Sequence, residues 1–385
     1  MRENVPTAKR LVIKVGTRVL TESDNTLSLE VVRKIAAHSS NLIDEGKEVV
    51  IVSSGAIALG LNRMGLASRP KEINLLQAAA ALGQSHLMQA YETAFRTTGR
   101  ETAQILLTLE DIQKRDRYLN IRNTLLTLWE FRTVPVVNEN DTVSFSEITF
   151  GDNDILAAHL ANMIDADLLL ILSDIGGLYD RDPRKTRQAE LIAEVPRIDA
   201  QLFRSARGKG SAVSSGGMES KLKAAQIATR GGSGVIIAGG GETPLDRLLA
   251  GEEIGTYFLP APRRIRGKKK WIAFNPKVEG SIVIDSGGER AIIQRRKSLL
   301  PAGITEVHGR FKMGSNVSIR NQRNEEIARG LTNFSSDELE RIKGLRTDKI
   351  PQVLGTGSYF EEAVHRDNMA IVPDGSEQNG PEKIV

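Results

Sequence analysis

The sequence contains no cysteine, and this absence excludes a disulfide framework and any metal site held by thiolates. Aromatic residues make up 4% of the chain, which leaves little material for stacking platforms that bind unpaired nucleic-acid bases. No apolar run approaches the roughly 18 residues needed to cross a membrane, and the apolar stretch near the amino terminus is too short for a signal peptide. We therefore expect a cytoplasmic protein without a membrane partner.

An excess of one charge is also missing. The 385 residues include 52 Lys and Arg against 48 Asp and Glu, which gives a net charge of +4. So small an excess in a chain of this length gives no reason to expect a nucleic-acid partner. The five histidines are scattered, with no pair at the spacing of metal ligands. With 40% hydrophobic residues, the chain has enough material for two or three domains with full cores.

Short apolar runs alternate with longer helical patterns from residue 10 to about 258. Alternation of this kind predicts an α/β domain with a mostly parallel sheet, and near-continuous apolar strands predict helices on both faces. We place this domain at residues 8–260. The expected strands are 10–15, 48–53, 102–108, 133–138, 166–173 and 233–239, and the expected helices are 28–46, 71–98, 116–131, 153–164 and 218–230.

The chain changes character after residue 260. In the run 259–274, two prolines are followed by basic residues, which indicates a linker between domains over 261–276. This is a simpler interpretation than a nucleic-acid patch. Short alternating runs with Gly and Asn turns then predict a small β-rich domain over 277–358. Residues 359–385 are polar and contain Gly and Pro, and we expect this tail to be largely disordered.

Candidate functional residues lie where the expected strands end, because ligands of parallel α/β sheets bind outside the carboxyl ends of the strands. Lys14 ends the first strand and is followed closely by a glycine, a pattern that suits a phosphate but is common in ordinary turns. The second strand ends in SSGAIALG (53–60). The backbone N–H groups that open a helix there can bind an anion, or the serines can simply cap it.

Polar loops follow the later strands. NEND (138–141) places four amide or acid residues in succession, more than one turn requires, and these side chains suit the ammonium and carboxylate of an amino acid. SDIGGLYDRDP (173–183) suits a nucleotide. The Gly/Ser-rich segment 206–225 leads into a helix and suits phosphates, although a disordered surface loop is its simpler interpretation.

The stretch FGDNDILAAHLA (150–161) has two interpretations. Asp and Asn favour helix starts, because their oxygens accept free backbone N–H groups, and an apolar helical run follows Asp154. The same residues also end the polar loop and are candidates for the chemistry. The chain has neither a G-x-x-x-x-G-K-[ST] motif nor an H-R-D and D-F-G set, which excludes a P-loop enzyme and a protein-kinase fold.

Taken in order, these strand-end motifs resemble the amino acid kinase superfamily and, within it, the glutamate 5-kinases. The motifs that carry the resemblance are VIKVGTRVL, VSSGAIALG, VPVVNENDTVSF, FGDNDILAAHLA, LSDIGGLYDRDPR and GGMESKLKAA. The later run LLPAGITEVHGRFKMGSNVSI resembles a PUA domain, so the resemblance covers about residues 8–358. It implies a three-layer αβα amino acid kinase fold with a mostly parallel central sheet, followed by a small β-rich PUA-like C-terminal domain.

The resemblance also implies an activity. This is ATP-dependent phosphorylation of the γ-carboxylate of L-glutamate to L-glutamyl 5-phosphate, the first step of proline biosynthesis, with Mg²⁺ accompanying ATP. Feedback inhibition by proline and a homo-oligomer, either a tetramer or a dimer, are further implications. Two alternatives stay open: another acceptor used within the superfamily, and an RNA-binding protein that acts through the PUA-like domain.

Residue roles follow from the resemblance, position by position. The implied catalytic residues are Lys14, Asp154 and Lys221. The two lysines would contact ATP phosphates, and Asp154 would orient the lysines. Neighbouring helical residues point about 100° apart. Asn153 can therefore face glutamate while Asp154 faces the lysines, so that the helix cap and the site are the same residues.

The remaining implied roles concern the two substrates. Ser173 and Ser220 stand where threonine is common in the family, and each keeps the hydroxyl group. No residue is implied as a metal ligand. The implied glutamate-binding residues are Ser54, Asp141, Asn153 and Asn138. The implied nucleotide-binding residues are Lys14, Ser173, Asp174, Ser215, Gly216, Gly217, Met218, Glu219, Ser220 and Lys221.

Overall fold

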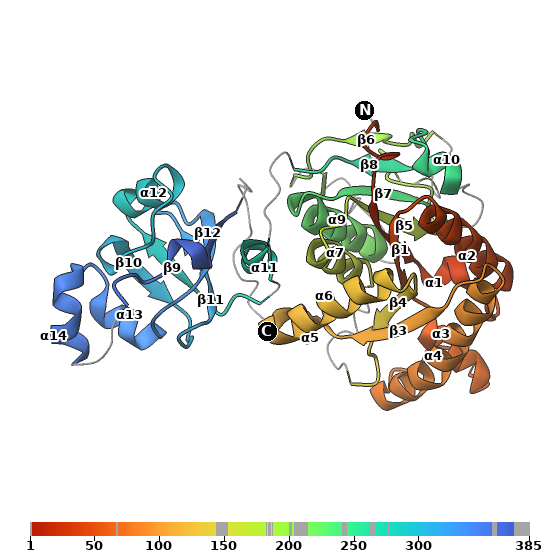
Figure 1. Cartoon of the computed structure of the whole chain (residues 1–385), viewed down its shortest axis with the longest axis horizontal. Coiled ribbons are helices and arrows are strands. Elements are labelled where there is room, and N and C mark those ends of the chain that lie inside the picture. The colour runs from red at the N-terminus through yellow and green to blue at the C-terminus, as the bar shows by residue number, and fades with distance from the viewer. Residues whose placement is uncertain are drawn as a thin grey trace. The chain divides into compact units, whose positions relative to one another are not determined.

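Runs of Val, Ile and Leu form most of the central strands of the first unit, because a strand that is covered on both faces buries nearly all of its side chains. The chain divides into two units, Met1–Pro262 and Arg263–Val385 (Figure 1). No helix in the described part is both long and apolar enough to cross a membrane. The computed structural model describes residues 2–66, 68–143, 153–181, 183, 186, 188–199, 202–203, 215–240, 245–261, 267–275, 277–355 and 360–372, with only the backbone of 215 and 216.

The first unit is built on a sheet with the strand order β3-β4-β2-β1-β5-β7-β8-β6. Every pairing from β3 to β7 is parallel, and β8 runs antiparallel to β7. The carboxyl ends of β1, β2, β4 and β5 therefore meet at one edge of the sheet. The strands are β1 (Arg10–Val15), β2 (Glu48–Ser53), β3 (Thr102–Leu107), β4 (Val134–Glu139), β5 (Leu168–Ser173), β6 (Glu194–Val195), β7 (Gly234–Gly239) and β8 (Thr256–Phe258).

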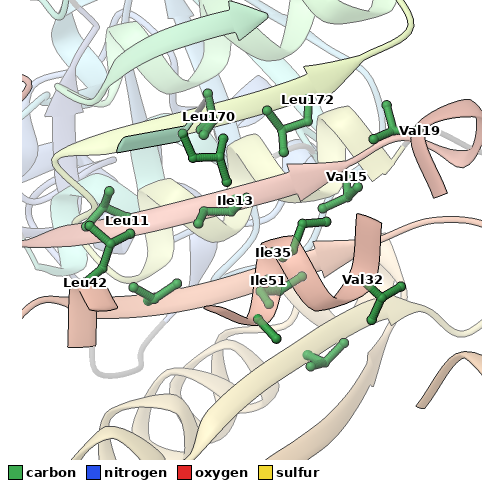
Figure 2. Close-up of a cluster of buried hydrophobic side chains, with 14 of the residues drawn as sticks. Leu11, Ile13, Val15, Val19, Val32, Ile35, Leu42, Ile51, Leu170 and Leu172 are labelled. Atoms are coloured by element: carbon green, nitrogen blue, oxygen red, sulfur yellow. The ribbon is translucent and has the colours of Figure 1, made fainter. Parts of the chain in front are cut away.

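Helices cover both faces of this sheet and make three layers. Figure 1 shows α2, α3 and α4 on one side and α7 and α9 on the other. Because side chains alternate along a strand, Ile13 of β1 faces Ile35 of α2 in the core cluster of Figure 2, while Lys14 belongs to the opposite face. The helices are α1 (Thr17–Leu20), α2 (Leu29–Asp44), α3 (Ala56–Arg63), α4 (Ile73–Arg96), α5 (Leu109–Gln113), α6 (Arg115–Glu130), α7 (Asn153–Met163), α9 (Ser215–Arg230) and α10 (Leu245–Leu249).

The expected mostly parallel α/β sheet is confirmed, and all six expected strands are present within one or two residues. The short strands β6 and β8 were not expected, because two or three residues carry no readable alternation. A residue before the expected domain start at residue 8 also contacts this unit. The guanidinium of Arg2 is buried and donates to the backbone oxygens of Glu252, Ile254 and Gly255, which closes the amino terminus against the end of the unit.

The second unit contains a five-stranded sheet in the order β10-β9-β11-β12-β13, as the prediction of a small β-rich domain requires. Its helices α12, α13 and α14 are short. The strands are β9 (Gly280–Ile284), β10 (Ile304–His308), β11 (Asn316–Arg320), β12 (Glu326–Leu331) and β13 (Met369–Ile371), and the helices are α11 (Lys268–Phe274), α12 (Ser286–Ile293), α13 (Ser336–Ile342) and α14 (Ile350–Leu354).

Two segments expected to lack regular structure contain some. Part of the expected linker 261–276 is helix α11, in which Ile272 is buried and its carbonyl oxygen accepts from Asn316 Nδ2 at 3.1 Å. Part of the expected disordered tail 359–385 is strand β13, which pairs antiparallel with β12 and buries Met369. Both segments are mostly polar, so the sequence did not predict that a few apolar residues pack them against the sheet. Residues 373–385 of the tail lie outside the described residues.

Candidate active site

Two lysines and one aspartate meet beyond the carboxyl end of β1. Lys14 comes from β1, Asp154 from the first turn of α7 and Lys221 from α9. Lys14 Nζ lies 2.7 Å from Asp154 Oδ1, and Lys221 Nζ lies 3.0 Å from Asp154 Oδ2. One carboxylate therefore holds two ammonium groups that come from separate parts of the chain.

This cluster is buried and carries a net positive charge. The side chains of Lys14, Asp154 and Lys221 are 8%, 4% and 12% exposed. Burial acts to raise the pKa of Asp154, but the two lysines outweigh it and hold the pKa below its ordinary value. The carboxyl group is thus ionised at neutral pH, and the three side chains together carry one excess positive charge, which attracts an anion such as a phosphate.

A chain of amides lies beside the charged cluster. Asn153, which precedes Asp154 in sequence, directs its Nδ2 to the carbonyl oxygen of Ser53 at 3.0 Å, to Ser54 Oγ at 3.0 Å and to Asn138 Oδ1 at 2.9 Å. These partners come from the ends of β2 and β4. The Asn153 Oδ1 atom is buried and has no hydrogen-bond partner among the described residues. The network therefore presents an unused acceptor.

The loop after β2 brings Ser54 to this network. Gly55 has φ +102°, a left-handed conformation that glycine adopts without a steric cost, and it precedes the first residue of α3. The Ser54 N–H donates to the carbonyl oxygen of Val15 at 3.1 Å, which fixes the loop against β1. Asp141 lies in the turn beyond β4 and is partly exposed.

The end of β5 forms a third group of predicted residues. Ser173 Oγ lies 3.2 Å from Asp174 Oδ1 and accepts from the Ile175 N–H at 3.4 Å. Asp174 Oδ2 pairs with the guanidinium of Arg18 at 2.9 Å, and the Arg18 side chain is 75% exposed. Burial acts to raise the pKa of Asp174, but hydrogen bonds from Arg18 and Ser173 outweigh it. The pKa therefore lies below its ordinary value, and this group is also ionised.

The predicted phosphate segment begins helix α9. The Lys221 Nζ lies 3.5 Å from the carbonyl oxygen of Gly217, one helical turn earlier. Glu219 pairs with Lys223 at 3.1 Å, and Ser220 Oγ is buried without a hydrogen-bond partner among the described residues. Met218 is partly buried, and only the backbone of Ser215 and Gly216 is described. Residues 204–214 and the loop 144–152 lie outside the described residues.

The structure thus brings the predicted residues to the same sheet edge in three neighbouring groups: Lys14, Asp154 and Lys221; Ser54, Asn138 and Asn153; and Ser173 with Asp174. Three further side chains contact these groups and were not predicted: Arg18 pairs with Asp174, Gln84 accepts from Asn138, and the Tyr91 hydroxyl contacts Ser53 Oγ. Gln84 has a signal in the sequence, because it is a polar residue on the helix face defined by Leu76, Ala80, Leu87 and Tyr91. Arg18 has none, since its partner Asp174 follows β5 and lies 156 residues away in the chain.

Comparison with known proteins identifies the families that this chain matches. Residues 9–239 match the model of the amino acid kinase family, and residues 280–354 match the PUA domain. The glutamate 5-kinase of Caldanaerobacter subterraneus is 44% identical over 372 residues, which covers 96% of this chain and 100% of that protein. The glutamate 5-kinase of Syntrophotalea carbinolica is 46% identical over 364 residues, covering 94% of this chain and 97% of that protein.

The chain belongs to the glutamate 5-kinases. A third relative of this family, from Azoarcus sp., is 46% identical and covers 96% of the chain and 100% of that protein. Among solved structures, the carbamate kinase from Giardia lamblia bound to AMP-PNP is 18% identical, with a TM-score of 0.48, and covers 66% of this chain and 100% of that chain. The family assignment confirms the resemblance that the strand-end motifs indicated.

Proposed function

We propose that this glutamate 5-kinase transfers the γ-phosphoryl group of ATP to the γ-carboxylate of L-glutamate and releases ADP and L-glutamyl 5-phosphate, the first step of proline biosynthesis. The observation that carries the proposal is that the consecutive residues Asn153 and Asp154 belong to two different clusters. Asp154 holds two lysines for phosphates, while Asn153 belongs to an amide network with an unused acceptor. The relatives named above supply the identity of the acceptor.

In the proposed reaction, a γ-carboxylate oxygen of glutamate attacks the γ-phosphorus of ATP. A new P–O bond forms, and the bond to the β-phosphate oxygen breaks, so that ADP leaves with the electron pair. The acceptor is already ionised at neutral pH, so no base has to remove a proton. Lys14 and Lys221 would stabilise the charge on the transferring group, and Asp154 would keep both ammonium groups in place.

The acceptor would be bound by the amide side of the site. An unused oxygen such as Asn153 Oδ1 suits the ammonium group of an amino acid, and Ser54 Oγ adds a polar group beside it. Asp141, in the turn that follows β4, would add a carboxylate. Ser173, Asp174 and the residues 215–221 would form the nucleotide side. These roles stay predictions of the resemblance, as do inhibition by proline, a dimer or tetramer, a cytoplasmic location and the domain limits.

Magnesium would enter as the ATP complex rather than as a resident ion. No group of three or more acidic or histidine side chains able to hold a metal occurs in the described part of the chain. Both oxygens of Asp154 already lie against lysines. This donor set fits an ion whose ligands are mainly phosphate oxygens and water, with at most one or two carboxylates from the protein. When bound, the ion would neutralise negative charge on the phosphate groups.

The test is ADP release by the purified chain with Mg²⁺–ATP and a panel of acceptors, with hydroxylamine present to trap an acyl phosphate. We expect glutamate-dependent ADP release with formation of the hydroxamate. Turnover only with acetylglutamate, aspartate, carbamate, UMP or isopentenyl phosphate would move the acceptor residues to another substrate. Turnover with none of them would reject the proposed function and favour RNA binding, which a salt-dependent tRNA filter-binding assay would then check.

A further inference from the structure

Helix α4 brings two polar side chains into the core of the first unit. Gln84 is 9% exposed and Tyr91 is 0% exposed. They lie seven residues apart on α4, close to two helical turns, and therefore on the same face. The Tyr91 hydroxyl lies 3.1 Å from Ser53 Oγ at the end of β2, and Gln84 Oε1 accepts from Asn138 Nδ2 at 2.8 Å at the end of β4. One helix thus contacts both strands of the amide network.

Backbone groups fix the direction of this network. The Glu139 N–H donates to Asn138 Oδ1 at 2.8 Å, so that atom is the oxygen of the amide. Asn153 Nδ2 lies 3.0 Å from the carbonyl oxygen of Ser53, which can only accept, so that atom is the nitrogen. Asn138 Nδ2 is left as a donor, and Gln84 supplies its acceptor. Hydrogen bonds therefore link Gln84, Asn138 and Asn153 in one defined order.

We propose that Gln84 is a positioning residue of the acceptor site, which acts through Asn138 on Asn153. This inference rests on the proposed function. Asn138 is 1% exposed, so without Gln84 its Nδ2 would be a buried donor lacking a partner, and the side chain would turn to find one. That turn would withdraw Oδ1 from Asn153 Nδ2 and leave it only the Ser53 carbonyl oxygen and Ser54 Oγ as acceptors. The Asn153 amide would then re-orient toward these two, and its free oxygen would move from the place where it is offered to the acceptor.

The backbone beneath Gln84 has little freedom to adjust. The neighbouring Gly83 lies so close to α3 that a Cβ atom there would sit 1.8 Å from the carbonyl oxygen of Ala56. A Cβ atom on Gly60 of α3 would sit 1.8 Å from the carbonyl oxygen of Ala79 of α4. The two helices are therefore in backbone contact at two positions of α4, Ala79 and Gly83, which both precede Gln84. Helix α4 therefore cannot shift to compensate for a substitution of Gln84, and the effect falls on its side-chain partner Asn138.

The experiment compares substitutions of Gln84 that remove or keep its hydrogen-bond acceptor. Gln84→Met keeps the length of the side chain and removes the acceptor. Gln84→Glu keeps an acceptor, because burial raises the pKa of the introduced carboxyl group and its neutral form resembles the amide. Gln89→Met places the same change at an exposed position of the same helix and serves as the control. Steady-state kinetics then give kcat and KM for glutamate and ATP separately.

We expect Gln84→Met to raise the KM for glutamate about tenfold or more, with kcat and the KM for ATP within about threefold of the unmodified chain. Gln84→Glu and Gln89→Met should stay within about threefold on all three values. Partial misfolding lowers the active fraction and the apparent kcat but leaves KM interpretable. If Gln84→Met yields no folded protein, Gln84→Ala removes the same acceptor with a smaller side chain and carries the same expectation.

An unchanged glutamate KM in Gln84→Met, a parallel rise of both KM values, or a Gln84→Glu variant equally impaired would overturn the inference. The route through Asn138 has its own test. In an Asn138→Ala background the relay is already broken, so Gln84→Met should cause no further change in glutamate KM. A second rise of about tenfold there would overturn the route. Absence of glutamate turnover by the unmodified chain would instead reject the proposed function, a result that these variants cannot imitate.

Discussion

Replacement of Asp154 by asparagine tests the charged cluster most directly, because the shape is kept and only the negative charge is lost. The carboxylate oxygens lie 2.7 Å from Lys14 Nζ and 3.0 Å from Lys221 Nζ. At an effective dielectric constant of about 20, each distance corresponds to roughly 6 kcal/mol of attraction. Desolvation of three buried charges offsets most of this, and loss of one partner from a buried ion pair typically costs about 3–5 kcal/mol. We expect that loss in the free energy of unfolding.

The same substitution has an expected effect on catalysis. Two ammonium groups would share the site without their common anchor and would move apart, so the transferring phosphoryl group would lose aligned charge. We expect kcat to fall by about 10²–10³-fold, with a smaller change in the KM for glutamate. Asp167→Asn is a matched control. Asp167 accepts from the backbone N–H groups of Lys9 and Arg10 at the opposite edge of the sheet, so kcat should be unaffected there.

The stability change should depend on pH with a definite sign. The folded pKa of Asp154 is below its ordinary value, so ionised Asp154 stabilises the fold above about pH 4, the ordinary pKa of an aspartate. This contribution is lost as the pH falls below that value towards the folded pKa. Urea unfolding of both forms from pH 7 down to about pH 3 should show the difference shrinking in acid. A difference that grows in acid, or a kcat within about twofold of the unmodified chain, would refute the assigned geometry.

Three further substitutions test other parts of the molecule. Lys221→Ala should lower kcat by about 10²–10³-fold with little change in glutamate KM, measured by ADP release; a KM effect alone would place Lys221 in acceptor binding. Gly83→Ala should lower the urea unfolding free energy by about 1–3 kcal/mol or more, because its Cβ would meet the Ala56 carbonyl oxygen; an unchanged midpoint would contradict the close α3–α4 contact. Met369→Ala should destabilise the second unit by about 2–5 kcal/mol and speed hydrogen exchange in β12, and unchanged exchange would show that β13 does not support the sheet.

Much of the fold could be read from the sequence because its signals are local. The six principal strands are runs of apolar residues, and a run of that kind between turn residues has few stable alternatives to a buried strand. Strands β6 and β8 and the attached segments α11 and β13 could not be read in this way. Each depends on a few residues whose burial is decided by distant partners, such as Asn316 Nδ2 for the backbone of Ile272.

The sequence by itself determined which residues stand at the strand ends, and its motifs indicated the family. Consecutive placement of Asn153 and Asp154 on a helix also determined that the two side chains diverge. Only the tertiary structure decided what they meet. Lys221 is 67 residues from Asp154 in the chain, and Gln84 is 54 residues from Asn138. The parallel sheet brings such residues to one edge. A hydrogen bond or ion pair between them depends on their distance in the fold and not on their spacing in the sequence, so no periodic pattern of residues reveals it.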